Sequence, residues 1–230
     1  MSDGKVIVET RKLVKIYKLG DNLVHALRGV NLKIMQGEAV AIMGPSGSGK
    51  TTLLNMLGAM DIPTSGEVII DGVNISGMGD KQLTLIRRHK IGPIFQFYNL
   101  IPVLTAFENV ELPMIFAGFS KDAMAARARQ LLTTVGLKGR IEHRPDELSG
   151  GEQQRVAIAR ALANNPAIIL GDEVTGDLDT KTGEEIVNML LKLSKEEKRT
   201  LIIVTHDPNV GAKMDRILRI RDGQIVGEDK

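Results

Sequence analysis

The segment Gly44–Thr51, with the sequence GPSGSGKT, constrains the fold of this chain more than any other segment. It matches the phosphate-binding pattern G-x-x-x-x-G-K-[ST] at every fixed position. The apolar run 39–43 before it is typical of a buried strand, and residues 52–57 after it are typical of a helix start. In such a unit the glycines let backbone N–H groups turn toward phosphate oxygens, and the helix N-terminus adds partial positive charge. The segment therefore predicts a phosphate-binding loop within an α/β fold.

Two side chains of this loop suit a bound nucleoside triphosphate. The Lys50 ammonium can reach the outer phosphates, and the Thr51 hydroxyl can ligate Mg²⁺. The structural alternative is a glycine-rich turn that matches the pattern by chance. The flanking strand and helix favour the nucleotide site, because the pattern acquires its function in that context.

The composition excludes several kinds of site. The 230 residues include no cysteine, which excludes disulfides, thiolate metal ligands and cysteine nucleophiles. With 30 basic and 28 acidic residues the net charge is +2, so there is no electrostatic argument for binding nucleic acid. No apolar run approaches the roughly 20 residues that span a bilayer, and residues 1–5 lack a signal-peptide core. We therefore expect a cytoplasmic chain whose role at any membrane comes through a partner.

Strands and helices alternate in a pattern that is interrupted once. The continuously apolar runs 167–170 and 201–204 are typical of parallel strands buried on both faces. The tail is typical of a β-hairpin that turns at Asp222-Gly223. The sequence therefore predicts an α/β fold with a mostly parallel sheet, an antiparallel β portion and a mostly helical insertion over about residues 81–144. Further expected strands are 6–8, 30–34, 39–43 and 67–70, and expected helices are 123–135, 152–163 and 183–193.

A pair of carboxylates, Asp172-Glu173, directly follows the apolar run 168–170. Carboxylates at the C-terminal end of a strand lie where ligands bind in open α/β sheets. A P-loop enzyme needs an aspartate there to hold Mg²⁺, directly or through water, and the next carboxylate can orient an attacking water. Two acidic residues can also simply solvate a strand end. The P-loop upstream favours catalysis, with Asp172 at the metal and Glu173 at the water.

The sequence LSGGEQ, residues 148–153, precedes a helical run. By itself it is typical of a glycine turn in which Ser149 caps the following helix. Together with the P-loop, however, this hexapeptide resembles the signature of the nucleotide-binding domains of ATP-binding cassette (ABC) proteins. The resemblance extends over nearly the whole chain, with the motifs in the family's order.

The resemblance implies roles for residues that would carry little weight alone. Tyr17 resembles the aromatic residue that stacks on adenine, Gln96 the Q-loop glutamine that offers its amide oxygen to Mg²⁺ or water, and His206 the switch histidine that contacts the γ-phosphate. The segment 176–179 is similar to the D-loop. The implied catalytic residues are Lys50, Gln96, Glu173 and His206, and the implied metal ligands are Thr51, Gln96 and Asp172.

In this family the signature motif serves the nucleotide that a second copy holds. The resemblance therefore implies a head-to-tail homodimer that closes on two molecules of ATP with Mg²⁺ and opens after hydrolysis. It implies one P-loop NTPase domain over residues 1–230, with a RecA-like core and β subdomain in 1–80 and 145–230 and a helical subdomain with the Q-loop in 81–144. The residues implied to contact nucleotide are Tyr17, Gly44, Pro45, Ser46, Gly47, Ser48, Gly49, Lys50, Thr51, Thr52, Ser149, Gly150, Gly151 and Glu152.

Three positions depart from the family's usual pattern. Val174 stands where proline is common after the glutamate, Gly171 stands where alanine is common, and Pro93 is unusual just before the Q-loop. None of them removes a catalytic group. We expect Val174 and Gly171 to loosen the loop that positions Glu173, and ATP hydrolysis to persist.

Six of the seven aromatic residues lie between Phe95 and Phe119. Some must form the insertion's own small core, and the others can form an exposed apolar groove, a feature that marks partner sites. In exporters that this chain resembles, a short cytoplasmic helix of the membrane partner docks near the Q-loop. Full burial of Tyr98 and Phe116 would remove support for such a groove. The hypothesis places it near Gln96, with contributions from Phe97, Tyr98, Leu100 and Phe116.

Within the family, segments 92–100 and 104–110 look closest to the lipoprotein-release and macrolide-export group. This likeness implies an ATPase subunit bound to the inner face of the cell membrane through an integral membrane permease. A cell-division-type ATPase that signals without moving a solute is an alternative, and so is a soluble ABC protein that acts on ribosomes or DNA. The soluble class more often carries two cassettes or a long coiled-coil insertion, and neither is present in this sequence. A nucleotide kinase would leave the signature hexapeptide unexplained.

Overall fold

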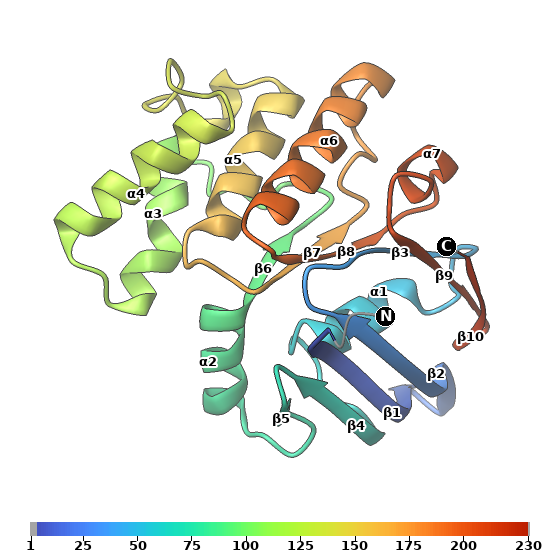
Figure 1. Cartoon of the computed structure of the whole chain (residues 1–230). Helices are drawn as coiled ribbons and strands as arrows, with labels where there is room; N and C mark the ends of the chain where they lie inside the picture. Colours follow the sequence, from blue (N-terminus) through green and yellow to red (C-terminus); the bar gives the residue numbers. More distant parts are fainter. Residues whose placement is uncertain (1–3, 230) are drawn as a thin grey trace.

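A six-stranded sheet runs through the middle of the molecule and confirms the predicted α/β fold (Figure 1). The computed structural model describes residues 4–229. The strand order is β10-β9-β3-β8-β7-β6, and every neighbouring pair is parallel except β9 and β10, which form the expected hairpin. The strands are β3 (Ala39–Met43), β6 (Ile91–Ile94), β7 (Ile168–Asp172), β8 (Thr200–Val204), β9 (Arg216–Arg221) and β10 (Gln224–Asp229).

A second, antiparallel sheet packs below the first in the order β2-β1-β4-β5. Its main feature is a long hairpin of β1 (Val6–Leu19) and β2 (Asn22–Met35), of which the sequence predicted only the outer ends. Register shifts interrupt β1 at several points, and Lys12 has a φ of 46°. Each shift moves the inward side chains out of the simple alternation, so the apolar pattern conceals the strand's full length. The sheet is completed by β4 (Ser65–Ile70) and β5 (Val73–Asn74).

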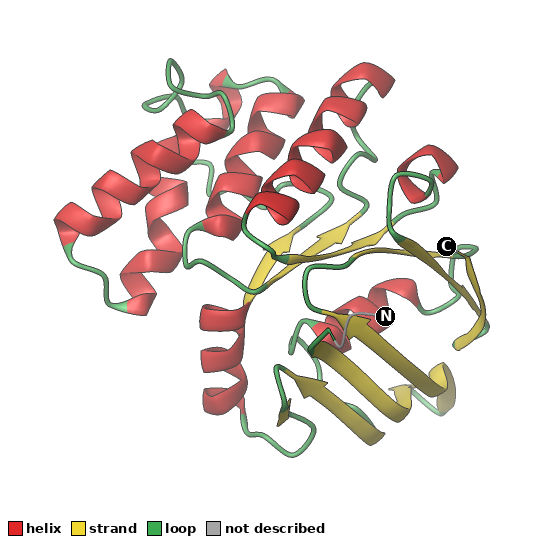
Figure 2. Ribbon diagram, viewed as in Figure 1, coloured by secondary structure: helices red, strands yellow, loops and turns green. Residues whose placement is uncertain are grey.

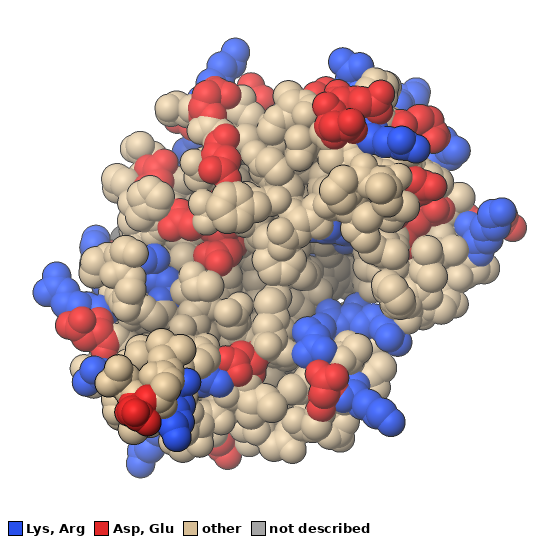
Figure 3. Space-filling model, turned by 180° about the vertical axis from the view of Figure 1, so that it is seen from behind, with Lys and Arg blue, Asp and Glu red and all other residues tan. Residues whose placement is uncertain are grey.

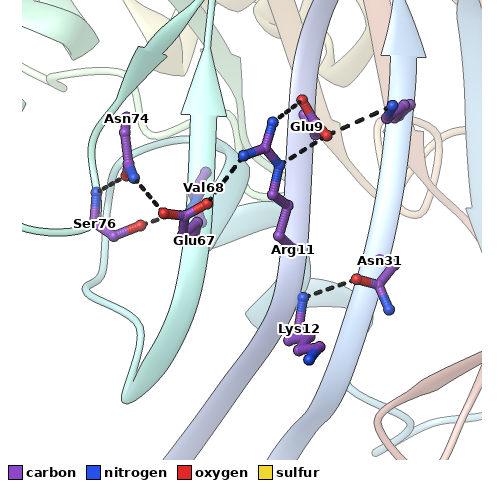
Figure 4. A network of polar contacts seen from close by, with 9 residues as sticks. Glu9, Arg11, Lys12, Asn31, Glu67, Val68, Asn74 and Ser76 are labelled. Atoms are coloured by element: carbon purple, nitrogen blue, oxygen red, sulfur yellow. Dashed lines mark hydrogen bonds and ion pairs between the residues drawn. The ribbon is translucent and has the colours of Figure 1, made fainter.

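The outer face of this antiparallel sheet carries a polar network (Figure 4). Arg11 on β1 lies between Glu9 on the same strand, with 3.0 Å between the nearest N and O atoms, and Glu67 on β4, at 3.4 Å. Asn74 on β5 donates to Glu67, and the Ser76 hydroxyl accepts from the Val68 amide. Exposed pairs of this kind contribute little individually. The network therefore serves mainly to align β1, β4 and β5 at the solvent side.

The helices divide between the two faces of the six-stranded sheet (Figures 1 and 2). The first helix lies on the same face as the antiparallel sheet, and the four long helices α3 to α6 lie on the opposite face. The bounds are α1 (Lys50–Leu57), α2 (Asp80–Lys90), α3 (Ala106–Ala117), α4 (Lys121–Thr134), α5 (Gly150–Leu162), α6 (Thr180–Glu196) and α7 (Pro208–Gly211), with a 3₁₀ turn at Pro145–Glu147.

The six-stranded sheet separates two hydrophobic cores, because successive side chains of a strand point to opposite faces. On β8, for example, Leu201 and Ile203 join the core under α3 to α6, whereas Ile202 and Val204 join the core shared with α1 and the antiparallel sheet. All four side chains are fully buried. This two-sided burial explains the continuously apolar runs that identified β7 and β8 in the sequence.

The range 81–144 contains more than helices. Most of α2 falls in it, and so does β6, which forms the edge of the six-stranded sheet beside β7. The compact helical part consists of α3 and α4, which pack against α5. Fully buried Asn109 on α3 ties down the preceding loop through the backbone of Ile101 and Leu104. We therefore propose that the helical subdomain begins after β6.

The surface shows no large region of one charge on the face seen in Figure 3, where basic and acidic side chains are interspersed. Within residues 4–229, none of the helices has the length and apolar character that crossing a membrane requires.

Candidate active site

The loop between β3 and α1 is closed in by backbone on two sides, which explains its glycines. A Cβ on Gly44 would collide with the carbonyl oxygen of Ile220 on β9. Gly49 has a φ of 103°, and a Cβ there would lie 2.5 Å from the Ala26 carbonyl oxygen. The Gly223 amide, in the β9–β10 turn, donates to the Ser48 carbonyl over 2.9 Å. The neighbouring strands therefore hold the loop in a shape that only glycine permits.

Inside this loop the groups present fit an anion. The Lys50 ammonium donates to the carbonyl oxygens of Gly44 and Pro45 over 2.9 and 2.8 Å, and no ion pair of Lys50 within 4.0 Å is formed among residues 4–229. The Ser48 hydroxyl is 3% exposed and has no hydrogen-bond partner among the described residues. An ammonium bonded to backbone carbonyls and an unpaired hydroxyl at the N-terminus of α1 are the groups that a phosphate would engage.

The end of β7 brings the predicted metal-binding aspartate to this loop. The Thr51 hydroxyl lies 3.4 Å from Asp172 Oδ1. Burial raises the pKa of the Asp172 carboxyl, and the neighbouring Glu173 charge raises it further, while Thr51 and Lys50 act in the opposite direction. Within residues 4–229 there is no cluster of three or more histidine or acidic side chains that could hold a metal. A cation at this point would therefore draw most of its ligands from phosphate and water, as Mg²⁺ commonly does.

Glu173 and His206 meet at the ends of β7 and β8. The Glu173 backbone has a φ of 48°, and its amide donates to the Val204 carbonyl over 3.0 Å. This left-handed turn directs the carboxylate at His206, whose Nδ1 lies 2.9 and 3.0 Å from the two carboxylate oxygens. The His206 side chain is 75% exposed, whereas the Glu173 side chain is 18% exposed. The histidine thus holds the carboxylate from the solvent side.

Gln96 lies on the loop after β6 and faces the predicted D-loop. Its Nε2 atom is 3.3 Å from the position that a Cβ on Gly176 would take. The contact brings the predicted Q-loop residue to the segment that follows Glu173. Lys50, Thr51, Asp172, Glu173, His206 and Gln96 therefore come from the carboxyl ends of β3, β7, β8 and β6.

Tyr17 lies near the far end of β1 and is held from two sides. Its hydroxyl donates to Asp61 over 2.8 Å, and the Lys15 ammonium lies 4.8 Å from the ring centroid. Burial raises the pKa of Tyr17, with the Asp61 hydrogen bond adding to the shift and the Thr52 side chain opposing it. Because Lys15 takes one face of the ring, a planar ligand has only the opposite face on which to stack.

The signature residues form a helix N-terminus, as the sequence predicted. Ser149 is the N-cap of α5, and its hydroxyl accepts from the Glu152 amide while Glu152 accepts from the Ser149 amide over 2.9 Å. The backbone N–H and hydroxyl of Ser149 lower the pKa of Glu152, and Arg140 helps from 3.1 Å. This capping box fixes the two glycines at the exposed end of the helix.

Within one chain the signature does not reach the P-loop. No hydrogen bond or ion pair of the described residues joins Gly44–Thr51 to Ser149–Glu152. Figure 1 shows α1 and α5 on opposite faces of the six-stranded sheet, with the N-terminal end of α5 directed away from the sheet. The fold therefore brings together the phosphate loop, the carboxylates and His206, and leaves the signature apart from them.

Two of the departures from the family pattern compensate each other. A Cβ on Gly171 would lie 2.6 Å from Val174 Cγ1, so the valine side chain fills the space that an alanine methyl would need. Val174 is 3% exposed, and its carbonyl accepts from the buried Gln154 over 2.9 Å. The turn that carries Glu173 is therefore packed and tied to α5, contrary to the expected loosening. Pro93 lies on the edge strand β6, where its missing N–H is tolerated.

An apolar hollow of about 440 Å³ opens between β6, α2, α3 and α5. Phe116 lines it and is 63% exposed, as the groove hypothesis required. Gln96, Phe97, Tyr98 and Leu100 do not line it; Phe97 is exposed outside the hollow, and Tyr98 turns toward Gly150. Their part in a partner groove stays a prediction. The other apolar lining residues include Pro93, Phe95, Leu112 and Pro113. We name this hollow the α2–α3 groove.

Comparison with known proteins identifies the family. Residues 27–176 match the family described as ABC transporter. The chain is 51% identical over 228 residues to the uncharacterized ABC transporter ATP-binding protein MJ0796 of Methanocaldococcus jannaschii, covering 97% of both chains. A solved structure described as a dimeric, post-hydrolysis state of the MJ0796 cassette bound to ADP and Pi superimposes with a TM-score of 0.91 and covers 97% of this chain and 98% of that one.

Two relatives with named systems are almost as similar. The lipoprotein-releasing system ATP-binding protein LolD of Geobacter metallireducens is 46% identical, and the match covers 96% of this chain and 99% of LolD. The macrolide export ATP-binding/permease protein MacB of Bdellovibrio bacteriovorus is 45% identical over 97% of this chain, which corresponds to 34% of MacB.

The raised pKa of Asp172 predicts that Asp172→Asn stabilises the nucleotide-free protein. A raised pKa means that the folded state favours the neutral carboxyl, so ionisation at neutral pH opposes folding. We expect the Tm of Asp172→Asn to exceed the parent's at pH 7.5. The difference between the two Tm values should narrow as the pH falls toward the ordinary aspartate pKa of about 3.9. Thermal unfolding from pH 7.5 down to about pH 4, near the ordinary aspartate pKa, measures both. Asp222→Asn at the exposed β9–β10 turn is the control, and a gap independent of pH would contradict the assignment.

The Gly171–Val174 contact predicts strong coupling between the two positions. Gly171→Ala alone is expected to cost about 1–3 kcal/mol of unfolding free energy, because its methyl overpacks against Val174. In the Val174→Ala background the same change is expected to cost much less. Denaturant unfolding of the double-mutant cycle measures the difference. Gly171→Ala combined with Val110→Ala on α3 provides the matched control, and simple additivity in both cycles would refute the compensation.

Proposed function

The chain belongs to the ABC transporter family as an ATP-binding and ATP-hydrolysing subunit, and on that premise we propose that two copies close head-to-tail over two Mg-ATP to drive a membrane permease. The observation that carries the dimer is the separation of the signature from the P-loop within one chain. A two-fold arrangement presents each motif to the other copy twice, so it completes both sites at once. The solved MJ0796 cassette is described as dimeric, which supports the same arrangement here.

In the proposed site the phosphates displace the internal partners of the P-loop. Lys50 exchanges the Gly44 and Pro45 carbonyls for outer phosphate oxygens, while the loop N–H groups and the N-terminus of α1 bind the rest. Thr51 and Asp172 are the side chains positioned to hold Mg²⁺ together with the phosphates, and Gln96 is the third proposed ligand. Bound Mg²⁺ would neutralise charge that develops on the phosphate oxygens.

Hydrolysis needs a carboxylate that orients water, and Glu173 is proposed for that role. Its left-handed turn and its contact with His206 fix the carboxylate beside Asp172. The His206 side chain is exposed next to Glu173, so it is suited to contact the γ-phosphate and to register its loss. Gln96 approaches from the Q-loop and links this point to the helical side of the molecule.

The remaining nucleotide contacts are proposed at the two edges of the site. The free face of Tyr17 is offered to adenine, with Thr52 beside its hydroxyl. From the second copy, Ser149, Gly150 and Gly151 would approach the γ-phosphate with the exposed N-terminus of α5, at which Glu152 fixes the cap. Helix N-termini favour anions there as well.

The α2–α3 groove is the proposed docking site for a cytoplasmic segment of the permease. It is concave and largely apolar, and it borders the Q-loop at Phe95 and Asn99. Phe119 adds exposed apolar surface just beyond α3. Docking here would attach the chain to the inner face of the cell membrane, which is the proposed location.

The permease is proposed to be of the export or lipoprotein-extraction type. The LolD relative is named for lipoprotein release, and MacB is named as an ATP-binding and permease protein in one chain for macrolide export. Both are about 45% identical to this chain over nearly its full length, so the motor is proposed to serve a permease of that group.

Glu173→Gln is expected to separate ATP binding from hydrolysis. ATP binding should persist, because the phosphate loop is untouched, while hydrolysis should fall at least about 100-fold through loss of the carboxylate. The ATP-bound variant should then accumulate as a dimer in sedimentation velocity. Glu142→Gln is the matched control, because it makes the same change from carboxylate to amide at an exposed residue outside the proposed site; it should behave as the parent. A Glu173→Gln chain that stays monomeric at saturating ATP would refute the shared site.

Phe116→Asp is expected to release the chain from its membrane partner. The substitution places a charge in the apolar α2–α3 groove, far from the phosphate loop, so the ATPase activity of the isolated chain should remain within about twofold. Affinity purification of the tagged chain from native membranes should recover a polytopic membrane protein with the parent but at least about tenfold less with Phe116→Asp.

Ile115→Asp is the matched control, since Ile115 is exposed on the same helix but does not line the groove. Equal recovery of the membrane protein by Phe116→Asp and the parent would contradict docking at this groove.

A further inference from the structure

The guanidinium of Arg160 is held in an uncommon way. It projects from α5 and donates to the carbonyl oxygen of Tyr98 over 2.7 Å and to that of Asn99. Burial lowers the pKa of Arg160, and no ion pair with a carboxylate is formed within residues 4–229. A partly buried cation paired only with backbone carbonyls is costly to retain. Its two hydrogen bonds therefore serve the conformation of the loop that accepts them.

That loop is strained at the two residues that Arg160 holds. Tyr98 has a φ of 58° and Asn99 a φ of 48°, the left-handed region that a bulky residue such as tyrosine rarely adopts. Consecutive residues in this conformation need surrounding contacts to keep them there. Both carbonyls that receive the Arg160 hydrogen bonds belong to this turn, so the guanidinium is the side-chain contact that adds to the turn's own backbone hydrogen bonds.

The Tyr98 side chain extends from the turn to the signature. Its hydroxyl oxygen lies 3.0 Å from the position that a Cβ on Gly150 would take, and Leu178 of the D-loop is 3.5 Å from the same point. Gly150 and Arg160 are ten residues apart on α5, roughly 15 Å along the helix axis. The loop after β6 thus meets α5 near both ends of the helix: Arg160 hydrogen-bonds its backbone, and the Tyr98 hydroxyl packs close to Gly150.

The contact between Arg160 and the Tyr98-Asn99 turn borders the α2–α3 groove. Arg160 and Asn99 both line this hollow, beside Phe95 and Phe116. An occupant of the groove would therefore contact Arg160 and Asn99 directly.

We propose that Arg160 is a positioning residue that locks the Q-loop onto the signature helix, so that Gly150 is held in place for the ATP of the second copy and is sensitive to what occupies the groove. Arg160 touches no nucleotide in this scheme, and acts through the Tyr98-Asn99 turn. The consequence for the second copy rests on the proposed function, whereas the lock itself is a property of the single chain.

The lock is tested in the monomer by amide hydrogen exchange. Arg160→Met removes the two donors and keeps the length of the side chain. Exchange at the Tyr98 and Asn99 amides, which are bonded within the turn, is expected to accelerate at least about tenfold. Arg155→Met is the matched control, because Arg155 on the same helix also donates to a backbone carbonyl, that of Val135, away from the Q-loop. Unchanged exchange in Arg160→Met, or equal acceleration in Arg155→Met, would overturn the lock.

The effect on the second copy is tested in the Glu173→Gln background. Arg160→Met is expected to leave ATP binding by the dilute monomer within about twofold and to raise the dimer dissociation constant at saturating ATP about tenfold, within the range usual for coupled sites. Arg160→Lys keeps one donor, so its dimer dissociation constant should lie between those of Arg160→Met and the Glu173→Gln parent. Loss of ATP binding in parallel with dimerisation would mean a general structural defect and would overturn the positioning role.

Tyr98→Leu keeps the two hydrogen bonds of Arg160 but removes the ring that reaches Gly150. This variant also tests the proposal if Arg160→Met does not fold. It should weaken dimerisation as Arg160→Met does, and an unweakened dimer would overturn the role of the ring. If the Glu173→Gln parent itself fails to dimerise with ATP, the proposed function fails, while the exchange experiment still decides the lock.

Discussion

The structure depends on the side-by-side, parallel register of β3, β8 and β7. Hydrogen bonding pairs Ile42 with Val204 and Asp172 with Val204, so the three strands end at the same level. Because they run in one direction, the chain leaves all three at one edge of the sheet. The phosphate loop, the two carboxylates and His206 are the residues that follow. Burial of this sheet between two cores makes its register rigid. The site residues at the ends of its strands are therefore held in fixed positions.

The same register explains why one chain holds only part of a site. The phosphate loop starts α1 on one face of the sheet, whereas the signature starts α5 on the other, at the end that points away from the strands. The signature is an exposed, capped helix N-terminus that begins with two glycines, and such a terminus can bind an anion. The phosphate loop of the same chain does not reach it. We therefore propose that a second copy completes the site, and that α5 links it to the α2–α3 groove, because α5 also carries Arg160 there.

The sequence predicted the parallel strands, the phosphate loop, the carboxylate pair and the capped signature helix, because each has a local pattern of burial or capping. It missed most of the β1–β2 hairpin, where bulges break the alternation of apolar side chains. It assigned β6 to a helical range, because four residues including Gly92 and Pro93 give no strand signal. It also could not foresee that Tyr98 turns toward Gly150 or that Val174 fills the space beside Gly171, since both depend on contacts between segments distant in the chain or on packing at atomic distance.

The most direct test of the shared site is a cross-link between two singly substituted chains, and the absence of native cysteine makes it clean. One chain carries Ser46→Cys in the phosphate loop, the other carries Ser149→Cys in the signature, and both carry Glu173→Gln. The account predicts that a short bifunctional maleimide joins the two variants when they are mixed with ATP, and joins neither variant to itself. Cross-linking that is indifferent to ATP, or that occurs only between identical variants, would contradict a head-to-tail site built from two copies.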